Sequence, residues 1–118
     1  MRNPIRFVVI ALGASFALAA ASANAAPDKK IERLWKSKCA ACHGEAGKGD
    51  TDKGKQMKIA DFTTADFQKK ADADLKKAIE EGVKVEEGGV KKEMDPYKDE
   101  LKPAQIDGLV AFIRELKK

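Results

Sequence analysis

The sequence has very few side chains that bind metals through nitrogen or sulfur. It contains one histidine, His43, and two cysteines, Cys39 and Cys42. A structural zinc site takes about four ligands, and no second cluster of cysteine or histidine elsewhere in the chain completes such a set. A thioredoxin-like redox pair is expected within a βαβ pattern, which the sequence also lacks. These absences disfavour both a zinc site and a thiol oxidoreductase.

Other absences exclude further classes of protein. No apolar run reaches the roughly 20 residues that a membrane-spanning helix needs. Lysines and acidic residues are interspersed without a block of one sign, and aromatic residues make up only 6% of the chain, so the sequence has no nucleic-acid-binding footprint. The glycines between residues 44 and 54 follow no predicted strand, which disfavours a phosphate-binding loop.

What the chain does contain is the run Cys39-Ala40-Ala41-Cys42-His43. A Cys-x-x-Cys-His run is typical of covalent haem c attachment. Two thiols three positions apart both reach the haem periphery and form thioethers, and the next residue offers an imidazole nitrogen to the iron. We therefore predict one haem c, attached through Cys39 and Cys42, with His43 as an iron ligand. A structural disulfide between the two cysteines is a further alternative.

The N-terminal segment has the three parts of a secretory signal peptide. Two arginines precede an uncharged apolar run over residues 7–20, and a small-x-small cleavage pattern follows at residues 23–25. We predict that residues 1–25 are a cleaved signal peptide and that residues 26–118 form one periplasmic domain. Cleavage is expected after Ala25 or after Ala26. The alternative is that the segment is retained as a membrane anchor. Cleavage would lower the formal net charge from +4 to +2, because both arginines are lost.

Hydrophobic periodicity and capping residues predict helices and no strands. The expected helix starts are marked by Asp28, by Thr63 or Thr64, by Asp72 and by Pro103. The corresponding helices are expected over residues 29–40, 64–70, 73–81 and from 103 to the C-terminus. The stretch 83–93, with two adjacent glycines at its middle, is predicted to be a loop.

The second face of the haem iron needs a ligand, and the chain has no second histidine. Two methionines, Met57 and Met94, remain after signal cleavage. Met94 lies 51 residues after His43, which lets the chain pass around the haem edge, whereas Met57 lies only 14 residues after it. We predict Met94 as the second axial ligand and Met57 as a core or haem-edge residue. A methionine ligand raises the reduction potential of haem iron.

These features together resemble class I cytochrome c, the small monohaem bacterial type. The resemblance covers nearly the whole mature chain, and it is carried by the Cys-x-x-Cys-His-Gly run over 39–44, by Met94 with Pro96 and Tyr97, and by residues 106–113. It implies an all-α cytochrome c fold, with three to five short helices wrapped around one covalently bound haem.

The sequence departs from the family pattern on both sides of the haem. The family commonly has proline directly after the methionine, whereas Asp95 here separates Met94 from Pro96. The family also often has a proline whose carbonyl accepts the N–H of the axial histidine. No proline lies between His43 and Asp95, so we expect another backbone carbonyl, within residues 58–60, to accept it.

A third departure concerns the first and last helices, which cross at close range in the family. The resemblance implies that Leu34 and Trp35 meet Leu109 and Phe112. The family often has glycine eight positions before the first cysteine, where this chain has Ile31. We expect Gly108 and Ala111 of the last helix to make room for it.

The predicted function is that of a soluble carrier of single electrons between periplasmic or membrane redox partners. It is not expected to be an enzyme, because His43 and Met94 fill both axial positions. The alternative is a five-coordinate haem protein with peroxidase or gas-binding activity, which would follow if Met94 does not bind. Whether the carrier diffuses freely or serves within a membrane complex stays open.

The resemblance also implies docking through a haem edge ringed by lysines. The candidate lysines are Lys36, Lys38, Lys48, Lys53, Lys55, Lys91 and Lys92. We expect a monomer that binds redox proteins, with no nucleic-acid partner and no membrane span after signal cleavage.

Overall fold

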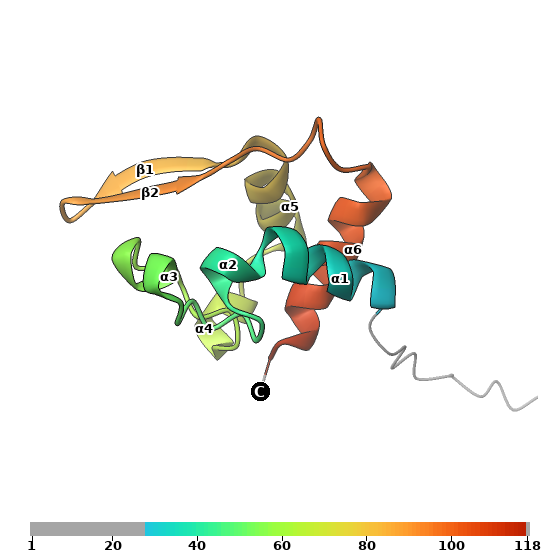
Figure 1. Ribbon diagram of the computed structural model, residues 1–118, viewed down its shortest axis with the longest axis horizontal. Helices are drawn as coiled ribbons and strands as arrows, with labels where there is room; N and C mark the ends of the chain where they lie inside the picture. Colours follow the sequence, from blue (N-terminus) through green and yellow to red (C-terminus); the bar gives the residue numbers. More distant parts are fainter. Residues whose placement is uncertain (1–27, 118) are drawn as a thin grey trace, which may run out of the picture.

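The computed structural model describes residues 28–117, so the predicted signal peptide lies outside the described residues. The described residues are mainly helical, as an all-α fold requires, with one short hairpin added. The elements are α1 (Lys29–Lys38), α2 (Ala40–His43), α3 (Asp52–Gln56), α4 (Ala65–Gln68), α5 (Asp72–Glu81), β1 (Val83–Glu87), β2 (Val90–Met94) and α6 (Pro103–Glu115). Helix α6 packs against both α1 and α5, and the hairpin projects from the end of α5 (Figure 1).

The predicted capping residues begin two of the helices. The Asp28 carboxylate accepts a hydrogen bond from the Lys30 N–H at 2.8 Å, and the Thr64 hydroxyl accepts one from the Phe67 N–H at the start of α4. Helix α6 begins at Pro103 as predicted. Helix α5 begins one residue earlier than expected, at Asp72, and its N-cap residue has no side-chain capping bond.

The hairpin corrects the prediction of a loop over residues 83–93. Strands β1 and β2 pair antiparallel, with Val83 opposite Met94. The turn is formed by Gly88 and Gly89, whose φ values of 58° and 74° suit the two-residue turns that join paired strands. The strands were not predicted because they lack a clear alternation of apolar and polar residues. They pair opposite charges instead: Lys84 lies opposite Glu93, and Glu86 opposite Lys91. Such opposite-charge pairs stabilise a hairpin without a hydrophobic pattern.

Helix α3 is a second correction, since none of the helices predicted from the sequence covers residues 52–56. It brings the described helices to six, against the three to five expected. The Thr51 hydroxyl accepts a hydrogen bond from the Gly54 N–H at 2.9 Å and donates one to the Cys42 carbonyl at 2.8 Å. Gly54 is buried against the same carbonyl: a Cβ on Gly54 would lie 2.6 Å from the Cys42 carbonyl oxygen. Backbone contacts with the haem motif therefore hold α3, which has no apolar face to read.

The core lies where α1 crosses α6, as the resemblance implied. Trp35, Ile106 and Leu109 are the most deeply buried side chains of the described residues. The rings of Trp35 and Phe112 lie 5.1 Å apart between centroids. The predicted contact between the first and last helices is thus confirmed.

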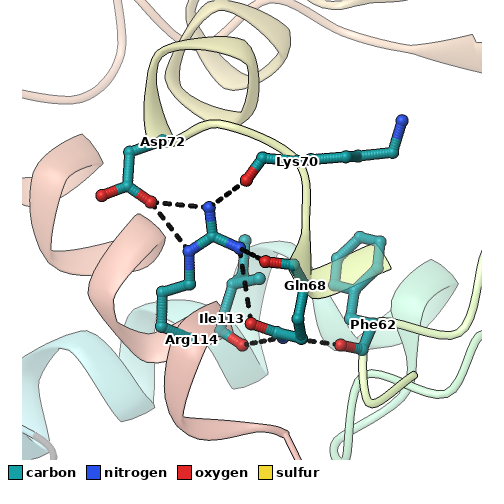
Figure 2. A network of polar contacts seen from close by, with 6 residues as sticks. All are labelled: Phe62, Gln68, Lys70, Asp72, Ile113 and Arg114. Carbon is teal, nitrogen blue, oxygen red and sulfur yellow. Dashed lines mark hydrogen bonds and ion pairs between the residues drawn. The ribbon is translucent and has the colours of Figure 1, made fainter. Parts of the chain in front are cut away.

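A network around Arg114 joins α6 to the segment that links α4 and α5 (Figure 2). The guanidinium of Arg114 donates to the Asp72 carboxylate at 2.7 Å, to the Gln68 carbonyl at 2.9 Å and to the Lys70 carbonyl. One planar group thus donates to acceptors on three residues from adjacent parts of the chain, a geometry that arginine suits and lysine does not.

The Gln68 side chain continues this network toward the aromatic residues. Its amide nitrogen donates to the carbonyl of Phe62 at 2.7 Å and to the carbonyl of Ile113 at 2.9 Å. The Phe62 ring stacks on that of Phe67 with centroids 4.2 Å apart. The network therefore holds the backbone at Phe62, whose ring lies 4.8 Å from the His43 imidazole between centroids.

Candidate haem site

The haem motif is formed where α1 ends and α2 begins. The helix expected over residues 29–40 ends at Lys38 and resumes at Ala40, with Cys39 between the two helices. The backbone N–H of His43 donates to the carbonyl of Cys39 at 2.9 Å, so one helical turn holds the motif together. Both thiols are free and half-buried, which excludes a disulfide between Cys39 and Cys42 in this structure.

A cavity of about 470 Å³ lies between the haem motif and the hairpin. It falls in the range of roughly 300–1,000 Å³ that small-molecule and cofactor pockets occupy. Cys39, Cys42 and His43 line it on one side, and Met94 lines it from the end of β2. Much of the remaining wall is apolar and comes from the following residues: Phe62, Phe67, Leu75, Ala78, Ile79, Leu109 and Ile113.

His43 is held in a form that suits an iron ligand. Burial lowers the pKa of His43 below its ordinary value, because a charged imidazolium loses water contacts in the interior. The side chain is therefore neutral at pH 7, and a neutral imidazole is the form that binds metals.

The prediction that a backbone carbonyl within residues 58–60 accepts a hydrogen bond from the imidazole N–H of His43 is wrong for this structure. Nδ1 of His43 is buried and has no hydrogen-bond partner among residues 28–117. The Ile59 carbonyl, within the stretch where an acceptor was expected, instead lies 2.8 Å from the position that a Cβ on Gly49 would take. The imidazole is oriented by packing, with its centroid 4.8 Å from that of the Phe62 ring and 5.9 Å from that of the Trp35 ring.

Trp35 also fixes the chain directly after the motif. Its indole N–H donates to the carbonyls of Gly44 and Glu45 at 3.1 Å and 3.2 Å. An aromatic side chain of α1 thus fills the core and holds the first turn after His43, which ties the backbone of the haem motif to α1.

Cys39 does not have the character of a redox-active thiol. Burial raises the pKa of Cys39 to about 11, the nearby ammonium of Lys38 opposing this rise only in part. Because the thiolate is the reactive form, this raised pKa leaves little of Cys39 in the reactive form at neutral pH. The described residues also contain no group of three or more histidine, cysteine or acidic side chains that could hold a metal ion.

The structure brings both methionines to the cavity. Met94 ends β2, Met57 caps the C-terminus of α3, and both are half-buried. Sequence reasoning singled out Met94 as the axial ligand and expected Met57 in the core or at the haem edge. Met57 is therefore the matched control for any test of Met94.

The lysines at the cavity only partly match those predicted from the sequence. Of the seven candidates, three line the cavity: Lys38, Lys53 and Lys92. Two others that sequence reasoning missed also line it, Lys58 and Lys70. Lys58 has a φ of 49°, a left-handed conformation that nothing in its side chain predicts.

A Cys-x-x-Cys-His motif and a methionine around one apolar cavity, within a small helical fold, define a c-type cytochrome. The cytochrome c family profile matches residues 29–117, and the chain belongs to this family. Covalently attached haem c is the cofactor of the family. Two free thiols, a neutral imidazole and an apolar cavity fit that group.

Two solved structures share the fold. The KustC0563 c-type cytochrome is 31% identical, with a TM-score of 0.62, over 74% of this chain and 96% of that one. A single-residue variant of the same cytochrome is 30% identical, with a TM-score of 0.60, over 74% of this chain and 98% of that one. No curated protein matches the chain by sequence. Within residues 28–117, no helix has the length and apolar character needed to cross a membrane.

Proposed function

We propose that this cytochrome carries single electrons, with His43 and Met94 as the two axial ligands of its haem iron. The observation that carries the proposal is that Met94 lines the same cavity as Cys39, Cys42 and His43. Haem c supplies an iron that alternates between the ferrous and ferric states. A thioether is a soft ligand that favours the ferrous state, so Met94 would raise the reduction potential.

The surrounding residues keep the site suited to electron transfer. Leu75, Ile79, Leu109 and Ile113 line the cavity from α5 and α6, and all four are buried. They exclude water from the wall on which they lie. Two protein ligands on the iron would leave no position for a substrate, which supports a carrier over an enzyme.

The lysines at the cavity support a docking role for its rim. Lys53, Lys58 and Lys70 line the cavity, and none of them forms an ion pair with another residue in the described part of the chain. Lys38 and Lys92, in contrast, pair with Glu100 and Glu87. Unpaired lysines attract acidic surfaces, and this attraction weakens with added salt. We infer that acidic redox partners dock at this lysine-bearing rim of the cavity. We also propose that the protein is monomeric and exported to the periplasm.

The test is an absorption spectrum of the periplasmically matured protein, oxidised and then reduced. Methionine-bound ferric haem has a weak red band, which we expect in the native protein and in Met57→Ala. Met94→Ala should lose the band, have a lower reduction potential and bind carbon monoxide rapidly when reduced. Met57→Ala is the matched control, because it truncates the same kind of side chain at the same cavity.

Three outcomes would contradict the proposal in different ways. A band lost in Met57→Ala and kept in Met94→Ala would make Met57 the ligand. A native protein without the band, whose ferrous form binds carbon monoxide rapidly, would be a five-coordinate gas-binding or peroxidase-like protein. A matured protein without any haem spectrum would refute haem attachment altogether.

A further inference from the structure

Gly82 lies between α5 and β1 in a conformation that other residues rarely adopt. Its φ of 73° and ψ of −177° belong to a region populated almost only by glycine. A Cβ at this position would overlap the carbonyl oxygen of Met94 and lie 2.8 Å from the nitrogen of Pro96 and 3.0 Å from the carbonyl carbon of Asp95. The backbone of Gly82 is therefore in direct contact with the segment that carries Met94.

That segment is held on both sides of this contact. Before it, Met94 pairs with Val83 in the first rung of the hairpin. After it, the N–H of Tyr97 donates to the Ile79 carbonyl at 2.9 Å, and the N–H of Lys98 donates to the Glu80 carbonyl at 3.2 Å. These carbonyls belong to the last turn of α5, where helices leave acceptors unsatisfied. The end of α5 thus anchors the chain directly after Met94.

We propose that Gly82 is a positioning residue for Met94. Its contact with the backbone of the Met94–Pro96 segment sets how far Met94 extends into the haem cavity, and hence whether the thioether binds the iron. The inference rests on the proposed function, because it takes Met94 as the axial ligand.

The nature of the contact makes the effect local to Met94. The atoms that a Cβ on Gly82 would meet are backbone atoms, which cannot move aside as the end of a flexible side chain can. Tyr97 and Lys98 hold the downstream chain on α5, so the displacement falls on the first rung of the hairpin and on the two residues before these anchors. Met94 belongs to that rung.

The experiment compares Gly82→Ala with Gly88→Ala in the haem-loaded protein. Gly88 is the matched control, because its φ is also positive, at 58°, while a Cβ there would have no atom within 4 Å. We expect Gly82→Ala to weaken the red band of methionine-bound ferric haem and to bind added imidazole about tenfold more tightly. Its reduction potential should fall, because methionine ligation raises it. Gly88→Ala should match the native protein in all three measurements.

Equal red bands and equal imidazole affinities in Gly82→Ala and the native protein would overturn the proposal. Equal changes in the two variants would also overturn it, since the cause would then be strain at a positive φ and not the contact with Met94. If Gly82→Ala yields too little protein, Gly82→Asn carries the same Cβ on a residue whose side chain can hydrogen-bond to the local backbone, and the same three measurements apply to it. A red band that survives Met94→Ala would refute the ligand assignment of the proposed function, and this proposal with it.

Discussion

Ile31 of α1 packs directly onto Gly108 of α6. A Cβ on Gly108 would lie 2.7 Å from Cδ1 of Ile31 and 2.9 Å from its Cγ1. The predicted room for the larger side chain is therefore provided by Gly108, whereas Ala111 is exposed. In this chain the small residue of the helix crossing lies on the last helix and the large one on the first.

This packing predicts that Gly108→Ala destabilises the protein. Alanine gains about 1 kcal/mol of helix propensity over glycine, but overpacking costs about 1–3 kcal/mol, so we expect a net loss of about 1 kcal/mol. Ile31→Ala should remove most of the loss caused by Gly108→Ala, with a coupling energy of about 0.5 kcal/mol or more. Chemical unfolding of the native holoprotein, the two single variants and the double variant measures this coupling energy. Strictly additive effects, or an Ile31→Gly variant that gains stability, would refute this packing.

How far the sequence alone predicts the site depends on how local each feature is. The haem motif is contiguous, so residues 39–43 identify the cofactor without any knowledge of the fold. Met94 needed an argument from chain length, and the sequence left Met57 either in the core or at the haem edge, whereas the structure places it at the cavity. The unpartnered Nδ1 of His43 depends on the path of a loop that carries no readable pattern.

The two elements that the sequence did not predict share a physical cause. Helix α3 is held through Thr51 and Gly54 against the backbone of Cys42, and the hairpin pairs charges across its strands. Neither element has a regular apolar face, which is the main signal for secondary structure in a sequence. The longer helices α1, α5 and α6 bury apolar faces and were predicted close to their observed bounds.

Substitution of Arg114 should test the network that joins α6 to the α4–α5 link. We expect Arg114→Lys to cost about 1–2 kcal/mol, because an ammonium does not reproduce the planar arrangement that reaches Asp72, Gln68 and Lys70 together. Asp72→Asn should cost less, about 0.5 kcal/mol, since that carboxylate is 73% exposed and exposed ion pairs are weak. Unfolding curves at low and high salt measure both. If both substitutions lowered the free energy of unfolding equally, and high salt removed both losses, the ion pair between Arg114 and Asp72 alone would account for the stabilisation.

The hairpin should lose stability in acid. A hydrogen bond and the positive charge of Lys92 lower the pKa of Glu87 below its ordinary value of 4.5. A carboxyl whose pKa is lower in the folded state stabilises it above the unfolded pKa, and this contribution is lost as the pH falls through the folded pKa. The protection of the β1 and β2 amides against hydrogen exchange, taken relative to the intrinsic exchange rate at each pH, should therefore fall below about pH 4. Glu87→Gln should remove the part of this loss that is linked to Glu87, and an unchanged pH profile of protection in that variant would contradict the assignment.

Haem attachment should be required for a stable fold. A domain of this size buries only about 60% of its unfolded surface and is marginal on its own. Leu75, Ile79, Leu109 and Ile113 belong to the core and also line the cavity, so an attached macrocycle would complete the packing around them. We expect the chain with both cysteines replaced by alanine to be largely unfolded by circular dichroism at 25 °C.

The matched control for this prediction is Met94→Ala, which keeps both thioether bonds. It should retain its helical signal even as the iron ligand is lost, because the covalently held macrocycle still fills the space between α5, α6 and the haem motif. Equal unfolding of the two variants would mean that the iron–sulfur bond, and not the apolar bulk of the haem, holds the hairpin and α5 in place. A stable, helical double-cysteine variant would mean that the nine buried apolar residues of the core suffice for folding.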